Sequence, residues 1–138
     1  MNAMRLAQIL ASNPFLQFAK LSSMNKNGQE HLQLGFDAFL KNHIGTLHAG
    51  ALFTAAKADA QAGLELSLEQ ENKEWQIAGY TSQIAYKRPA KGPVWVKTEV
   101  AEIDCEKGVA QTVSTLNNEA NEPLAELRIQ FTLTQGEQ

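Results

Sequence analysis

The residues best suited to chemistry lie in one short stretch, from Asn42 to Gly50, which reads NHIGTLHAG. It brings an amide, imidazoles and two glycines directly before a run rich in alanine, the best helix former. A glycine-containing turn that leads into a helix presents unpaired backbone N–H groups and the positive end of the helix dipole. Such a turn suits a carbonyl oxygen that gains negative charge as water attacks the carbonyl carbon. The stretch therefore predicts a site for acyl chemistry.

One long helix, from Ala51 to about Leu68, must position this stretch. The segment between Gly50 and Leu64 holds six alanines and no proline. Helical periodicity places Asp59 on the apolar side and separates a polar face from an apolar one. The polar face carries Thr54, Lys57, Gln61 and Glu65, and the opposite face carries Leu52, Ala55, Ala56, Gly63 and Leu66. The small side chains let a sheet curl closely around this helix.

The remaining elements predict a largely antiparallel sheet, and so an α+β fold. A short amphipathic helix occupies residues 1–13, and Asn13-Pro14 ends it. Short turns join the strands, among them the Asn27-Gly28 pair that hairpins favour. Alternation is clearest where Ala125, Leu127, Ile129, Phe131 and Leu133 point inward. The expected strands are 15–24, 29–37, 75–88, 94–101, 109–116 and 125–134.

Length and composition limit the possible functions. A chain of 138 residues predicts a single domain, residues 1–138, with its core between residues 15 and 134. A formal charge of −3 gives no basic field for nucleic acid, and no apolar run is long enough to cross a membrane. The single cysteine, Cys105, cannot form an internal disulfide. These features predict a soluble, cytoplasmic protein.

Two short motifs carry a family resemblance. They are Asn42-x-x-Gly45-Thr46-Leu47-His48-Ala49-Gly50, followed by the long helix, and Tyr86-Lys87-Arg88-Pro89-Ala90. Together with the element order, they resemble the hotdog-fold acyl-CoA thioesterases, including the phenylacetate-pathway type and related domains of unknown function. The resemblance implies one long central helix wrapped by a curved, five- to six-stranded antiparallel sheet. It also implies a homodimer or a dimer of dimers, and coenzyme A as part of the substrate with no separate cofactor.

The resemblance also implies roles for individual residues. The amides near Ala49 and Gly50 would polarise the thioester carbonyl, while Asn42 and His48 would orient the thioester or the attacking water. We therefore predict Asn42, His48, Gly50 and Asp59 as catalytic residues. The predicted substrate-binding residues are Gly45, Ala49, Lys57, Tyr86, Lys87 and Arg88.

The chain departs from the family at Lys57. The family carries an Asp or Glu nine residues after the motif histidine, and here that position is Lys57. Asp59 is the nearest carboxylate, but two residues along a helix is a rotation of roughly 200°, so the two side chains point in different directions. A desolvated Lys57 with a lowered pKa could act as a base. The alternative is a non-catalytic protein that binds acyl-CoA or fatty acyl groups.

The other candidates have ordinary structural readings. His31 and His43 fit surface or loop positions, and no spacing of His, Cys and carboxylates predicts a metal site. Lys87, Arg88 and Lys91 could grip the phosphates of coenzyme A, or simply form a solvated strand end. A hydratase of the same fold would need an Asp, an Asn-Pro and a His in an arrangement that this sequence lacks.

Overall fold

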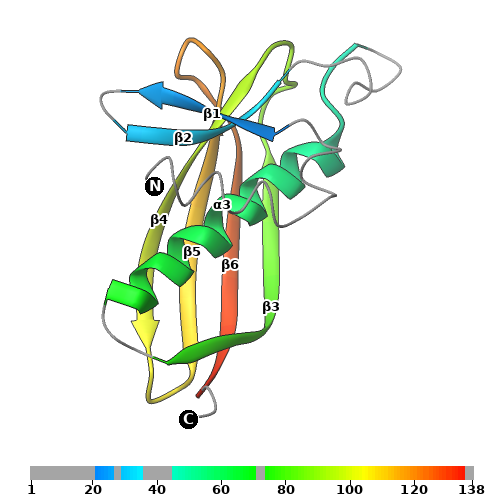
Figure 1. Cartoon of the computed structure of the whole chain (residues 1–138). Coiled ribbons are helices and arrows are strands. Elements are labelled where there is room, and N and C mark those ends of the chain that lie inside the picture. The colour runs from blue at the N-terminus through cyan, green and yellow to red at the C-terminus, as the bar shows by residue number, and fades with distance from the viewer. Residues whose placement is uncertain (1–20, 27–28, 36–44, 71–73, 136–138) are drawn as a thin grey trace.

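The computed structural model describes residues 21–26, 29–35, 45–70 and 74–135. Its elements are β1 (Leu21–Lys26), β2 (Gln29–Leu34), α3 (Ala49–Gln70), β3 (Trp75–Tyr86), β4 (Val94–Asp104), β5 (Val109–Asn117) and β6 (Pro123–Gln135). Six strands form one antiparallel sheet in the order β1-β2-β4-β5-β6-β3. Figure 1 shows α3 lying across one face of this sheet. The predicted α+β hotdog architecture is confirmed, with six strands.

The N-terminal elements are described only in part. The predicted helix at residues 1–13 lies outside the described residues, as do residues 15–20 of the first predicted strand. The hairpin itself is present, because β1 and β2 pair antiparallel with Lys26 opposite Gln29. The Asn27-Gly28 pair, for which the sequence predicts the turn, lies outside the described residues.

The core lies between α3 and the strands that it crosses. Ala55, Ala56 and Ala60 are fully buried on the helix, which packs mainly against β4 and β5. Their small side chains allow the close approach of helix and sheet that the sequence predicts. The five inward positions of β6 are all buried, Phe131 completely. Burial also alternates at the start of β4, where Val94 and Val96 are buried and Lys97 is exposed.

The helix differs from the prediction at its ends and on its apolar face. It begins two residues earlier than Ala51, so Gly50 lies inside the first turn rather than before it. Leu66 was expected on the apolar face and is only half-buried, whereas Leu64 and Leu68 are buried. Asp59 is buried as the helical periodicity predicts, with 6% of its surface exposed.

Candidate functional site at the start of the central helix

A short loop holds the start of α3 against the segment that follows β3. Gly45 adopts a φ of +83°, a left-handed conformation that glycine enters at little cost. The Leu47 amide donates a hydrogen bond to the Ala90 carbonyl at 2.9 Å, and the Leu47 side chain is buried in the core. The chain is therefore anchored one residue before the predicted catalytic histidine.

His48 caps the helix. Its carbonyl accepts hydrogen bonds from the Ala51 and Leu52 amides at 3.0 and 3.2 Å, and its Nδ1 accepts one from the Gly50 amide at 2.9 Å. Because Nδ1 is the acceptor, the neutral ring carries its hydrogen on Nε2. A Cβ at position 50 would lie 3.1 Å from Nδ1, so any larger residue there would press against the His48 ring. The exposed imidazole therefore presents an N–H donor beside the first turn of the helix.

Tyr86 joins the end of β3 to the same turn. Its hydroxyl donates to the Ala49 carbonyl at 3.1 Å, across 37 positions of sequence. Partial burial raises the pKa of the Tyr86 phenol, so the hydroxyl keeps its hydrogen at neutral pH. The structure thus brings together four predicted site residues, His48, Ala49, Gly50 and Tyr86. Asn42 lies outside the described residues.

Lys57 lies on the same helix face as Gly50, and its ammonium rests on an aromatic ring. Nζ lies 4.8 Å from the centroid of the Tyr80 ring, on β3, and 3.4 Å from Oε1 of Gln61. The Gln61 amide nitrogen in turn donates to Glu65 at 3.2 Å. Hydrogen bonds between successive turns therefore link Lys57, Gln61 and Glu65 along the predicted polar face of α3.

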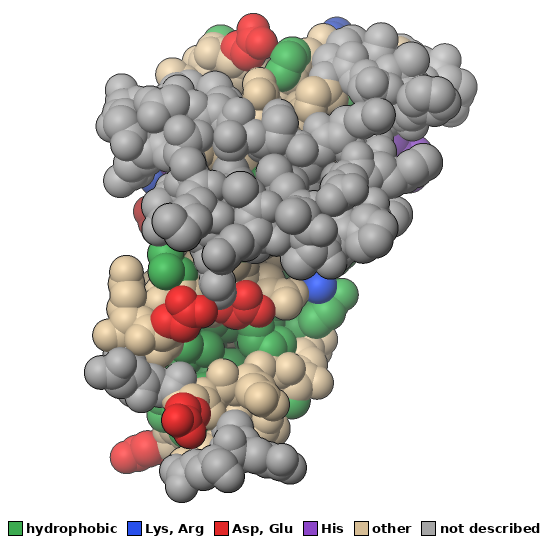
Figure 2. Space-filling model, viewed as in Figure 1, with side chains coloured by type: hydrophobic (Ala, Val, Ile, Leu, Met, Phe, Trp, Pro, Cys, Tyr) green, Lys and Arg blue, Asp and Glu red, His purple; other side chains and the backbone are tan. Residues whose placement is uncertain are grey.

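An open hollow of about 370 Å³ continues this face toward the end of α3. Figure 2 shows acidic side chains gathered on this part of the surface, with hydrophobic side chains between them. The hollow lies between the helix and the first half of β3. Its lining residues are Gln61, Glu65, Leu68, Glu69, Trp75, Gln76 and Ile77.

Asp59 belongs to a different cluster, between the helix and the sheet. Its Oδ2 accepts a hydrogen bond of 2.6 Å from the hydroxyl of Thr98 on β4, and Thr98 Oγ1 lies 2.6 Å from Ser114 Oγ on β5. Burial raises the pKa of the Asp59 carboxyl to about 6, although the Thr98 hydrogen bond opposes the shift. The nearby Thr112 hydroxyl is buried with no partner in the described part of the chain. Asp59 therefore points into the core, away from the exposed His48 ring.

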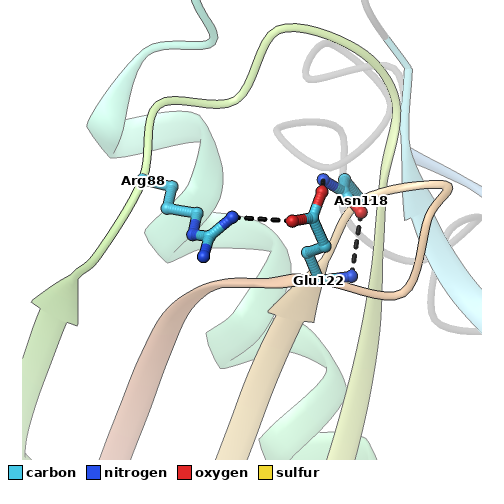
Figure 3. A network of polar contacts seen from close by, with 3 residues as sticks. All are labelled: Arg88, Asn118 and Glu122. Atoms are coloured by element: carbon cyan, nitrogen blue, oxygen red, sulfur yellow. Dashed lines mark hydrogen bonds and ion pairs between the residues drawn. The ribbon is translucent and has the colours of Figure 1, made fainter.

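The basic residues after β3 are already paired with carboxylates. Lys87 lies 3.6 Å from Glu126, and Arg88 lies 2.6 Å from Glu122. Figure 3 shows Asn118 on the other side of Glu122, where it both donates to the carboxylate and accepts from the Glu122 amide. These contacts lower the pKa of the Glu122 carboxyl, with the Asn118 hydrogen bond as the largest cause.

An open hollow of about 480 Å³ lies beside this network. Arg88 and Lys91 line it together with the acidic Glu119 and Glu122. The third predicted cation thus shares a surface with Arg88, whereas Lys87 pairs along the sheet with Glu126. Both signs of charge are therefore present at the mouth of this hollow.

Sequence reasoning missed the partners of these residues. Thr98 shares the two-residue alternation of Val94 and Val96, so the side of the strand that carries its hydroxyl can be read from the sequence, but its bond to Asp59 cannot. Ser114, Asn118 and Glu122 carried no signal. Within the described residues, no group of three or more His, Cys, Asp or Glu side chains could hold a metal ion. No helix in that part of the chain is long and apolar enough to cross a membrane.

Comparisons with known proteins show the family and the fold. The model of a domain of unknown function, DUF4442, matches residues 11–133. No curated protein matches the chain in sequence. Among solved structures, a Pseudomonas aeruginosa protein described as a probable thioesterase of unknown function is 25% identical. Its TM-score is 0.72, over 96% of this chain and 94% of that one.

Two further structures are similar in fold. A thioesterase from Haemophilus influenzae has a TM-score of 0.79 at 16% identity, over 98% of this chain and 92% of that one. A thioesterase family protein from Silicibacter pomeroyi has a TM-score of 0.73 at 17% identity, over 97% and 98%. The chain therefore belongs to the DUF4442 family of unknown function and has the hotdog fold of the thioesterase superfamily.

Proposed function

We propose that the protein hydrolyses an acyl-CoA thioester whose carbonyl is polarised at the start of α3. The observation that carries the proposal is the capped helix terminus, where His48 fixes the Gly50 amide. Among the described residues, the Ala49 amide has no hydrogen-bond partner, so it and His48 Nε2–H are the two donors left for a carbonyl oxygen. The thioesterase-superfamily neighbours support this choice of chemistry.

In the proposed reaction, water attacks the thioester carbon and the coenzyme A thiolate leaves. The oxygen that becomes negative accepts from the Ala49 amide and the His48 imidazole, aided by the helix dipole. Tyr86 holds the Ala49 carbonyl, and so fixes the direction of the first turn. Coenzyme A enters as part of the substrate, and the reaction needs no further cofactor.

The water that attacks the thioester carbon must give up a proton to a base. Asp59 remains a predicted base, and its carboxyl is ionised above a pH of about 6. Its hydrogen bond to Thr98 and its 6% exposure instead support a structural role. Asp59→Asn separates the two roles: a base loses kcat by orders of magnitude, whereas a structural acid changes the free energy of unfolding and leaves kcat nearly intact.

The coenzyme A phosphates belong, in this proposal, at the hollow beside Arg88. The Arg88 side chain is 60% exposed, and among the described residues its guanidinium pairs with Glu122 at the surface, so a phosphate can compete for it. Arg88→Ala is expected to raise KM severalfold with little change in kcat. The same substitution on a substrate lacking the phosphates, an acyl-pantetheine, should have no effect on KM.

We place the active molecule in the cytoplasm as a homodimer or a dimer of dimers. The single cysteine fits a reducing compartment. Strand β3 is at the edge of the sheet, paired only with β6 among the described strands, and it exposes Tyr80 and Tyr86. An edge strand of this length favours pairing with a second chain. Light scattering of the purified protein measures the assembly directly.

The decisive experiment is a panel of acyl-CoA substrates with His48→Ala as the variant. We expect the parent to hydrolyse at least one thioester, measured as the loss of thioester absorbance. In the variant we expect kcat to fall about a hundredfold, the scale of one lost oxyanion donor. His31→Gln is the matched control, because His31 bonds the Val96 carbonyl on the sheet. Equal turnover in His48→Ala and the parent would refute the site.

Lys57 favours the second candidate function, binding of an acyl ligand without hydrolysis. The residue stands where the resemblance implies a carboxylate. If binding is the only activity, the panel shows affinity without turnover. Lys57→Asp is then expected to create measurable hydrolysis in a chain that had none.

A further inference from the structure

Among the described residues, the Lys57 ammonium has no charged partner. Its contacts are the Tyr80 ring at 4.8 Å and a long hydrogen bond of 3.4 Å to Gln61. In the described part of the chain, no carboxylate oxygen lies within 4.0 Å of Nζ. Glu65 is reached only through the Gln61 amide.

Three other cations in the described part of the chain do have a carboxylate partner. The side chains of Lys87, Arg88 and Arg128 are 50%, 60% and 68% exposed, yet each contacts a glutamate. Lys57 is half-buried, and partial burial removes water from an ammonium without supplying a counter-charge. A ring face and one neutral amide oxygen compensate only in part. The ammonium thus retains donors for an anion that the described residues do not provide.

Lys57 also lies where an acyl ligand would pass. It is seven residues after Gly50, which at 100° per residue returns to nearly the same helix face about 10 Å further along. Gln61, its hydrogen-bond partner, lines the hollow between α3 and β3. Leu68, Trp75 and Ile77 form the apolar part of that hollow, and the carboxylates of Glu65 and Glu69 line its remainder together with Gln61 and Gln76. A chain running from the helix start toward the hollow would therefore meet the Lys57 ammonium.

We propose that Lys57 binds a carboxylate carried by the acyl ligand. The proposal rests on the proposed function for the path of the acyl group, and it names the substrate class: apolar acyl ligands that bear a carboxylate. Two sources share this chemistry. One is a thioester whose acyl chain ends in a second carboxylate, and the other is a free fatty acid, which carries its carboxylate at the head.

The test compares matched ligands that differ only in charge. Affinities of adipyl-CoA and hexanoyl-CoA, and of decanoate and decanol, are measured by calorimetry. The proteins compared are the parent, Lys57→Met and Lys97→Met. Methionine keeps an unbranched stem against Tyr80, and exposed Lys97 on β4 is the control cation. We expect the parent to prefer one charged ligand over its neutral match by about tenfold, the scale of one charge-assisted hydrogen bond.

The variants then decide the assignment. Lys57→Met should lose the preference while it binds the neutral ligand as before, and Lys97→Met should keep it. Preference for adipyl-CoA identifies a dicarboxylic acyl thioester, and preference for decanoate identifies a free acid. A preference that survives in Lys57→Met overturns the proposal. So does a parent protein that shows no preference for a charged ligand, or that binds none of the ligands. The calorimetric affinities do not depend on turnover. A protein that hydrolyses no thioester but shows a Lys57-dependent preference would therefore refute the proposed hydrolysis and leave the proposed carboxylate site intact.

Discussion

The two sides of helix α3 differ in how they surround a charged residue. Asp59 is closed between helix and sheet, and two hydroxyls accompany it there. Lys57, only two residues earlier, is on the open side against an exposed tyrosine. A rotation of roughly 200° separates them. The acid at position 59 is thus enclosed and hydrogen-bonded to the sheet, while the cation at position 57 lies on the open side of the helix.

On the side of α3 that faces the sheet, the largest expected effect is the dependence of the free energy of unfolding on pH. The Asp59 carboxyl has a pKa of about 6 in the folded protein, raised from 3.8 chiefly by burial. The folded state therefore binds the proton more tightly than the unfolded state. Stability is fully present below pH 3.8 and falls as pH rises to about 6, by about 3 kcal/mol for a shift of about two units.

Urea unfolding from pH 4 to pH 7 measures this loss. Asp59→Asn removes the titrating group and should flatten that part of the profile, so that the variant is more stable than the parent at pH 7. The expectation would be wrong if both proteins showed the same slope in this window.

Removing the hydroxyl that supports Asp59 should have the next largest effect. Thr98→Val leaves the buried carboxylate without its donor, and we expect a loss of about 2 kcal/mol at pH 7. Thr112→Val is the matched control, because its buried hydroxyl has no partner in the described residues and its removal should be neutral or stabilising. Equal destabilisation by the two substitutions, in thermal or urea unfolding, would contradict this account.

On the open side, Tyr86→Phe should cost less. The phenol loses one partly exposed hydrogen bond to the Ala49 carbonyl, worth about 0.5 to 1 kcal/mol. The larger consequence is expected in kcat, because the first turn of α3 loses its contact with β3. Tyr80→Phe keeps the ring and serves as the comparison. A stability loss without any change in turnover would remove Tyr86 from the site.

The smallest expected effect on stability belongs to Lys57→Met. The variant keeps the stem of the side chain and loses only a cation–π contact and a long hydrogen bond. We expect a change within about 0.5 kcal/mol, typical of surface substitutions. A loss as large as that of Thr98→Val would mean that Lys57 is structural, and the contrast between the two sides of α3 would disappear.

Periodicity predicts most of the fold, because burial repeats every two residues in β4 and β6 and every turn in α3. It places Asp59 on the buried side for the same reason. The start of the helix escaped prediction, since His48 is the cap and the usual cap signals are Ser, Thr, Asp and Asn. Its ring reaches back to the Gly50 amide, a local contact that composition does not reveal.

Contacts between residues far apart in the sequence could not be predicted. Thr98 meets Asp59 across 39 positions, and Arg88 meets Glu122 across 34, so both pairs depend on how the elements dock. The basic cluster was predicted from its charges alone, and its neutralisation by Glu122 and Glu126 could not be seen from them. The roles assigned to the site residues, Asn42 and Asp59 included, stay predictions.

The hydroxyls beneath α3 form a chain that can point in either direction. When Asp59 is ionised, Thr98 must give its only hydrogen to the carboxylate, and Ser114 must give its own to Thr98. When Asp59 is protonated, the order can reverse: Asp59 donates to Thr98, Thr98 to Ser114, and Ser114 to the Ala56 carbonyl at 3.5 Å. One proton entering the core thus flips a row of dipoles while every heavy atom stays in place.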